Sequence, residues 1–141
     1  MSGPRYAMVV DMRKCVGCQA CVIACKEENQ LQDDGFRCWV VQETRGRFPK
    51  LDQQIRSERC NHCAQASCVA ACPTGASHYG PGGSVQVNPA KCTGCKACMV
   101  GCAYGARYVH EDGHIDKCSF CMHRVQRGQL PACVSICPTS S

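Results

Sequence analysis

The sequence predicts an α+β fold in which one small unit of short strands, short helices and long cysteine-rich loops occurs twice. Sixteen of the 17 cysteines fall into four groups of four. The stretch around Cys15 returns around Cys92, and Cys68–Thr74 returns as Cys133–Thr139, which indicates a duplication. Aromatic residues make up only 6% of the 141 residues. A chain with so few large side chains usually needs metals or disulfides to fold.

The repeat also predicts where the regular elements lie. Strands are expected at Tyr6–Asp11 and Ser84–Asn88, each of which leads into a cysteine-rich loop. Helices are expected at Ala20–Asn29 and Ala97–Cys102, each carrying the fourth cysteine of its group. The order of elements in each unit is therefore strand, cysteine loop, helix and return strand.

Two inserts interrupt the repeat. The first runs from Gln30 to Ser57, and the second lies between Cys121 and Cys133. Inserts of this kind are places where a small core acquires contacts with a partner protein. Solvated loops are the equally simple alternative, and the sequence does not decide between the two.

The spacing of the cysteines predicts the cofactor. Groups one and three have two, two and three residues between successive cysteines, which is the bacterial ferredoxin pattern for [4Fe–4S] ligation. Sixteen thiolates at four per cluster predict four [4Fe–4S] clusters, held in two-cluster ferredoxin-like units. In chain order the four groups are Cys15, Cys18, Cys21 and Cys25; Cys60, Cys63, Cys68 and Cys72; Cys92, Cys95, Cys98 and Cys102; and Cys118, Cys121, Cys133 and Cys137.

Disulfides and zinc fit the cysteine pattern less well. Disulfide scaffolds have irregular spacings rather than repeated CxxC units, and two CxxCxxCxxxC runs are unusual for structural zinc. The formal charge of +5 counts every cysteine as neutral. Because each ligated cluster contributes roughly −2, four clusters would bring the total to roughly −3. The charge therefore does not indicate nucleic-acid binding, and no stretch has the length of apolar sequence that a membrane span needs.

In two-cluster ferredoxins the fourth cysteine of a run ligates the other cluster. Groups two and three are separated by 19 residues, a compact ferredoxin-like spacing, so they are expected to pair. Groups one and four are then left to pair across the ends of the chain. The predicted division is an outer unit, 1–58 plus 103–141, and an inner unit, 59–102. The predicted ligand sets are Cys15, Cys18, Cys21 and Cys137 for cluster 1; Cys118, Cys121, Cys133 and Cys25 for cluster 2; Cys60, Cys63, Cys68 and Cys102 for cluster 3; and Cys92, Cys95, Cys98 and Cys72 for cluster 4.

Full cysteine ligation predicts electron transfer rather than catalysis. With four thiolates on each cluster, no iron position is left open for a substrate, and each cluster would carry one electron at a time. Cys38 lies outside the four groups and is expected to be a small buried hydrophobic residue. His62 is expected to form a local hydrogen bond rather than to bind metal.

Five motifs carry a resemblance to a known family. The chain resembles the four-cluster iron–sulfur subunits of molybdopterin respiratory oxidoreductases, such as polysulfide, thiosulfate and dimethyl sulfoxide reductases. The resemblance covers nearly the whole chain. The motifs are Cys15-Val16-Gly17-Cys18-Gln19-Ala20-Cys21, Cys60-Asn61-His62-Cys63, Cys72-Pro73-Thr74-Gly75-Ala76, Tyr104-Gly105-Ala106-Arg107-Tyr108 and Lys117-Cys118-Ser119-Phe120-Cys121.

The resemblance implies two partners and a location. One partner is a molybdopterin catalytic subunit, and the other is a membrane anchor subunit that reacts with quinone. The chain itself would be non-catalytic and peripheral on the bacterial cytoplasmic membrane, on a side that the sequence does not indicate. The alternative is a free soluble polyferredoxin that carries electrons by diffusion.

Overall fold

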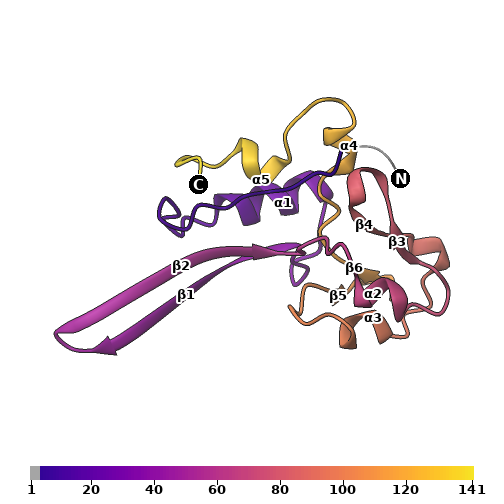
Figure 1. The fold of residues 1–141 in the computed structure, drawn as a ribbon, viewed down its shortest axis with the longest axis horizontal. Coiled ribbons are helices and arrows are strands. Elements are labelled where there is room, and N and C mark those ends of the chain that lie inside the picture. Colours follow the sequence, from indigo (N-terminus) through magenta and orange to yellow (C-terminus); the bar gives the residue numbers. More distant parts are fainter. Residues whose placement is uncertain (1–3) are drawn as a thin grey trace.

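The computed structural model describes residues 4–141 and confirms the α+β class (Figure 1). All of its strands pair as antiparallel two-stranded sheets: β1–β2, β3–β4 and β5–β6. The helices are short, apart from α1. In chain order the elements are α1 (Ala20–Asn29), β1 (Cys38–Arg47), β2 (Lys50–Arg59), α2 (Ser67–Ala70), β3 (Ser77–Tyr79), β4 (Val85–Val87), α3 (Ala97–Val100), β5 (Tyr108–Val109), β6 (Ile115–Asp116), α4 (Met122–Val125) and α5 (Ala132–Ser135), with 3₁₀ turns at Pro81–Gly83 and Pro89–Lys91.

One lobe of the molecule contains α2, α3 and the two small sheets β3–β4 and β5–β6 (Figure 1). Helices α2 and α3 pack against each other. Val85 and Ile115 are buried at the centre, in contact with the cysteine-bearing faces of both helices. Cys68 and Cys98 belong to the same core. The core is therefore built as much from cysteine as from aliphatic side chains.

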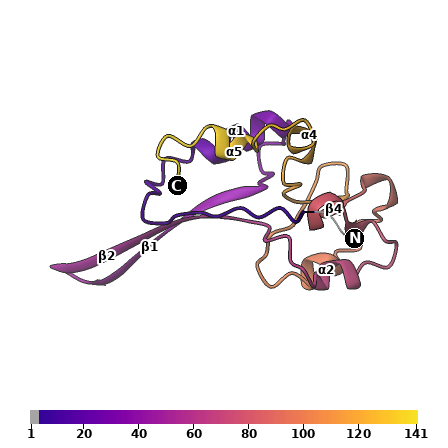
Figure 2. The same ribbon diagram turned by 45° about the horizontal axis from the view of Figure 1, so that its top comes forward.

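The second lobe pairs α1, near the start of the chain, with α5, near its end, as two views show (Figures 1 and 2). Its core contains Val22 and Cys25 from α1 and Cys38 from the start of β1. The pairing of α1 with α5 repeats the pairing of α3 with α2. The duplication that the sequence indicates is thus visible in the fold.

The repeat extends to the backbone. Gly17 and Gln19 have φ angles of 70° and 61°, and the equivalent Gly94 and Lys96 have 69° and 63°. These residues have a left-handed backbone conformation, which reverses the direction of the cysteine loop just before each helix. Glycine adopts this conformation without strain. A Cβ at Gly94 would lie 2.5 Å from the carbonyl oxygen of Gly113, so this position also has no room for a side chain.

Three expected elements need correction. Residues Tyr6–Asp11 form no strand: the backbone N–H of Tyr6 donates to the carbonyl of Gly82 over 2.9 Å, but residues 7–11 continue without strand pairing. The predicted strand at Ser84–Asn88 is shorter, Val85–Val87, and the predicted helix at Ala97–Cys102 ends at Val100. The helix at Ala20–Asn29 is confirmed.

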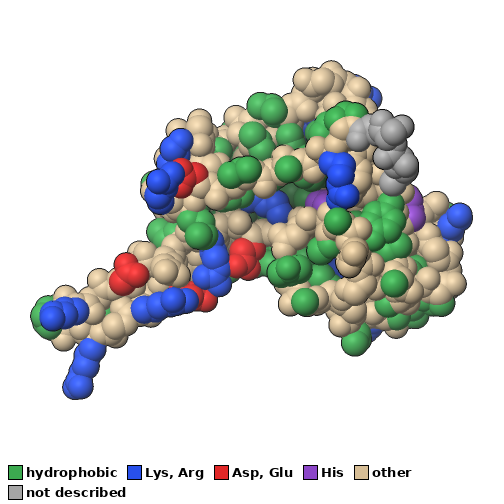
Figure 3. Space-filling view, in the orientation of Figure 1, with side chains coloured by type: hydrophobic (Ala, Val, Ile, Leu, Met, Phe, Trp, Pro, Cys, Tyr) green, Lys and Arg blue, Asp and Glu red, His purple; other side chains and the backbone are tan. Residues whose placement is uncertain are grey.

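The first insert forms a ribbon rather than a solvated loop. Strands β1 and β2 pair along ten residues each, from Cys38 opposite Arg59 to Arg47 opposite Lys50. The ribbon extends away from the two lobes (Figures 1 and 2). Phe48, between the two strands, is 83% exposed. Lys and Arg side chains lie along the ribbon and at its tip (Figure 3). Contact between this ribbon and a partner stays a prediction.

The second insert contains α4 and packs on the molecule itself. Arg124 Nη1 and His123 Nε2 each lie 2.7 Å from a carboxylate oxygen of Glu28 on α1. The division into outer and inner units stays a prediction. Ile115, which that division places in the outer unit, packs in the core of the α2–α3 lobe.

Candidate metal centres

Two cysteine sets lie in the lobe of α2 and α3. One cavity is lined by Cys72 from the loop after α2 together with three cysteines of group three, Cys92, Cys95 and Cys98. A second cavity is lined by Cys102 together with three cysteines of group two, Cys60, Cys63 and Cys68. Each cavity therefore combines three cysteines of one group with one of the other. The paired helices cause this arrangement, because each helix directs its chain end toward the neighbouring loop.

The other cysteines gather in the lobe of α1 and α5. A third cavity is lined by five cysteines: Cys15, Cys18, Cys21 and Cys137, which form the predicted set of cluster 1, and Cys133, which is predicted for cluster 2. Cys118, Cys121 and Cys133 lie near Cys25. Burial, together with the neighbouring charge on Cys25, raises the pKa of each of these three thiols, to about 12 for Cys118.

Backbone N–H groups point at cysteine sulfurs in equivalent loops. The N–H of His62 donates to Cys60 Sγ and that of Phe120 donates to Cys118 Sγ, both over 3.4 Å. The same distance separates Ser77 N from Cys72 Sγ and Ser141 N from Cys137 Sγ. Such donors stabilise a thiolate.

The pKa values of two cysteines show this effect. Hydrogen bonds from the hydroxyl and the N–H of Ser141 lower the pKa of Cys137 to about 6. At Cys72 burial acts in the opposite direction, yet hydrogen bonds from Ser77 and Thr74 lower its pKa to about 7. Thiolates supplied with N–H donors are the ligands that iron–sulfur clusters use, so these loops fit the predicted cofactor.

Arg107 lies between the two cavities of the α2–α3 lobe and lines both of them. Its side chain is 6% exposed, and its Nη2 lies 2.9 Å from Cys68 Sγ and 2.7 Å from Ser77 Oγ. A buried guanidinium normally has a carboxylate partner. Here a cysteine sulfur accepts its hydrogen bond instead.

Lys117 is likewise buried beside sulfur, whereas Arg59 is half-buried and also lies near a cysteine sulfur. Lys117 is 2% exposed, donates to the carbonyls of Val85 and Cys118, and lies close enough to the sulfurs of Cys60 and Cys118 to be stabilised by their charge. Arg59 Nη1 donates to Met8 Sδ over 2.8 Å and lies 3.6 Å from Cys133 Sγ, at the border of the cavity that holds Cys21.

None of these three cations is predicted as a functional residue by the sequence patterns above. The sequence nevertheless contains features that could have pointed to two of them: Lys117 directly precedes a cysteine, and Arg107 belongs to a motif shared with the family that the chain resembles. Only the fold shows which of the 16 Lys and Arg residues are buried beside sulfur.

Cys38 is buried, as predicted, but its surroundings are polar as well as apolar. Its thiol donates to the carbonyl of Cys21 over 3.5 Å and packs against Cys25. The thiol of Cys38 also interacts with the thiol of Cys21, which is the main reason that the pKa of Cys21 falls to about 5. Cys38 therefore connects two cysteines that are predicted to serve different clusters.

His62 forms a hydrogen bond, but with a residue 23 positions away rather than with a near neighbour in the chain. Its Nδ1 accepts a hydrogen bond from the N–H of Val85 over 2.9 Å, and its ring meets that of Phe120 edge-on. Burial, with Lys117 and Arg107 nearby, lowers the pKa of His62 to about 3. The imidazole is therefore neutral at physiological pH.

Comparison with known protein families supports the cofactor. The 4Fe-4S dicluster domain matches residues 51–141, and a second 4Fe-4S dicluster domain matches residues 14–76. The chain belongs to the 4Fe-4S dicluster family. [4Fe–4S] clusters are accordingly the cofactors of this dicluster protein.

Several curated relatives of this dicluster protein are similar along nearly its whole length. It is 41% identical over 145 residues to the protein NrfC of Escherichia coli K12, which covers 100% of this chain and 65% of NrfC. It is 42% identical over 143 residues to the thiosulfate reductase electron transfer subunit PhsB of Salmonella typhi, which covers 97% of this chain and 73% of PhsB. A polysulfide reductase chain of Wolinella succinogenes is 40% identical over 141 residues, covering 97% of the dicluster protein and 74% of the Wolinella protein.

The dicluster protein thus spans 65% of the length of NrfC, just under two thirds. Within residues 4–141, none of the helices is both long and apolar enough to cross a membrane.

Proposed function

We propose that this chain is a non-catalytic electron-transfer subunit that carries four [4Fe–4S] clusters. In this function it relays electrons between a molybdopterin catalytic subunit and a membrane anchor subunit that reacts with quinone. The observation that carries the proposal is that two cavities of the α2–α3 lobe are each lined by four cysteines drawn from two groups, with the buried Arg107 lining both. A third cavity, in the other lobe, is lined by five cysteines.

The proposed ligand sets cross between groups. Cys72 completes the set of Cys92, Cys95 and Cys98, and the cavity that these four cysteines line supports this assignment. The cavities around Cys102 and Cys137 support the corresponding sets in the same way. For the remaining set, the packing of α1 on α5 supports Cys25 as the partner of Cys118, Cys121 and Cys133.

The residues between the sets support an order for the relay. Arg107 borders the set that contains Cys92 and the set that contains Cys60. Lys117 lies between Cys60 and Cys118, which connects that set to the next. Arg59 and Cys38 then lie where the sets of Cys25 and Cys21 meet. The proposed order of clusters is therefore 4, 3, 2, 1.

Each residue has a distinct role in this scheme. A bound [4Fe–4S] cluster supplies one-electron redox chemistry. The cysteines hold the iron, while the loop N–H groups and the buried cations offset the negative charge that the cysteine sulfurs carry. Arg107, Lys117 and Cys68 are buried, and burial at these positions would keep water away from that part of the path and reduce the reorganisation that charge movement requires.

The names of the relatives support the assignment to a reductase complex. PhsB is named an electron transfer subunit of thiosulfate reductase, and the Wolinella protein is named a chain of polysulfide reductase. We place the chain peripherally on the membrane, held there by its partners. The exposed ribbon of β1 and β2 offers one surface for such contacts.

Two measurements test the proposal. The anaerobically purified protein should contain about 16 iron atoms per chain, and reduced samples should give electron paramagnetic resonance (EPR) signals from four interacting clusters. About eight iron atoms would contradict the four-cluster assignment. Separately, an affinity tag on the chain should recover a molybdenum-containing subunit from native membranes. Recovery of a stable iron-loaded monomer alone would favour the free polyferredoxin.

A further inference from the structure

The loop between β5 and β6 brings two histidines together. The antiparallel register continues past Val109 and Ile115, because His110 N–H donates to the carbonyl of His114 over 2.8 Å. Gly113, at a φ of 84°, donates to the carbonyl of His110 and closes the turn. Directly opposed residues of an antiparallel pair project from the same face. The two imidazole rings accordingly stack, with their centroids 4.4 Å apart.

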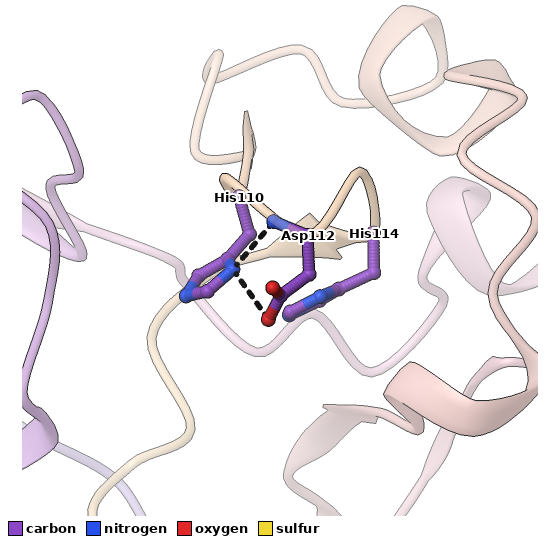
Figure 4. A group of neighbouring side chains, drawn as sticks. All are labelled: His110, Asp112 and His114. Atoms are coloured by element: carbon purple, nitrogen blue, oxygen red, sulfur yellow. Dashed lines mark hydrogen bonds and ion pairs between the residues drawn. The ribbon is translucent and has the colours of Figure 1, made fainter.

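A carboxylate completes the cluster (Figure 4). Asp112 lies at the tip of the turn, and its Oδ2 is 3.3 Å from Nδ1 of His110. Its backbone N–H also points at that nitrogen, over 3.2 Å. The three side chains each place one ligand atom within 4.8 Å of the others. Donors bound to a single tetrahedral zinc ion lie about 3.4 Å apart, so side-chain movement of about 1 Å would bring the three into coordination range.

The surroundings do not oppose a cation. These residues border an open surface groove of about 750 Å³ that Arg37 also lines. The Arg37 guanidinium is already bound to the carboxylate of Asp116, with Nε 2.8 Å from Oδ2. Its charge is therefore largely balanced. Asp112 is 75% exposed, so a bound ion would be reached directly from solvent.

From this geometry we propose that His110, Asp112 and His114 form a binding site for a borderline divalent metal ion such as Zn²⁺. Two imidazoles and one carboxylate are ligands that Zn²⁺ and similar ions prefer, whereas Ca²⁺ and Mg²⁺ prefer oxygen alone. Three protein ligands leave one coordination position for water. None of the sixteen cysteines is a ligand of this site, although Cys92, a proposed ligand of cluster 4, lines the same groove. The iron content therefore has to be measured together with zinc binding.

The test uses the iron-loaded chain, freed of loosely bound metal by a chelator and equilibrated with Zn²⁺ by dialysis under anaerobic conditions. Zinc and iron are then measured together. Unaltered protein should take up about one zinc per chain with no loss of iron. His114→Asn and Asp112→Asn should each weaken zinc binding by at least about tenfold, also with iron unchanged.

The chain offers matched controls. Glu111→Gln removes the same charge from the same loop, and His78→Asn removes an exposed imidazole elsewhere; both variants should bind zinc as the unaltered protein does. The proposal is overturned if the unaltered protein takes up no additional zinc. It is equally overturned if His114→Asn and Asp112→Asn bind zinc as tightly as the two control variants.

Discussion

Replacing Arg107 with a neutral residue should lower the midpoint potentials of the two clusters proposed on either side of it. The guanidinium is buried, with Nη2 2.9 Å from Cys68 Sγ, so solvent screens its charge weakly. Reduction adds negative charge, which a neighbouring cation favours. At an effective dielectric constant of about 20, a unit charge about 6 Å away contributes about 2.8 kcal/mol. For a one-electron couple this corresponds to about 120 mV.

The assay is a redox titration of the iron-loaded protein followed by EPR. Arg107→Gln should shift two of the four midpoints downward by about 120 mV, with the iron content unchanged. Arg107→Lys keeps the charge and should restore most of the shift. Arg45→Gln, on the exposed ribbon, removes the same charge where water screens it and should leave every midpoint in place. Unchanged midpoints in Arg107→Gln, or an equal shift in Arg107→Lys, would refute the reasoning.

Three further predictions concern ligation and stability. Cys72→Ser should chiefly perturb the cluster of Cys92, Cys95 and Cys98, seen as the loss or change of one EPR signal; damage confined to the cluster of Cys60 would contradict the crossed ligand sets. Arg37→Met leaves the buried Asp116 carboxylate without its charge partner and should destabilise the holoprotein by about 3–5 kcal/mol. Arg45→Met, which breaks an exposed pair with Glu43, should cost less than about 1 kcal/mol in the same unfolding experiment. Burial acts to raise the pKa of Asp116, but its hydrogen bonds from Arg37 outweigh burial and hold the pKa below its ordinary value of 3.8. The ionised Asp116 carboxylate should therefore stabilise the fold above pH 3.8, and this contribution should be lost as the pH falls through the lower pKa of the folded state. The measurement compares the free energy of unfolding of the unaltered protein and of Asp116→Asn as the pH is lowered, and the two should converge below that folded pKa. A difference that stays constant with pH would contradict the assignment.

Local features were predictable from the sequence because they depend on neighbours along the chain. The helix at Ala20–Asn29 follows from its own residues, and the burial of Cys38 follows from its residue type. The strand expected at Tyr6–Asp11 did not form because a strand needs a partner, and a run of apolar residues says nothing about whether one is available. The insert at Gln30–Ser57 forms a ribbon because each of its two halves supplies the partner strand that the other needs.

Sequence by itself determined the cofactor type and the grouping of the cysteines, because ligand spacing within a run is a local property of a loop. Only the tertiary structure determined which Lys and Arg side chains lie beside the cysteine sulfurs. Lys117 precedes a cysteine in the chain, but the sulfur that receives the hydrogen bond from Arg107 lies on a helix 39 residues earlier. The tertiary structure also places Cys38 between Cys21 and Cys25, and His110 opposite His114 across a turn. Such contacts depend on how distant segments pack, and burial then determines how strongly the charges act, because a low-dielectric interior screens them far less than water does.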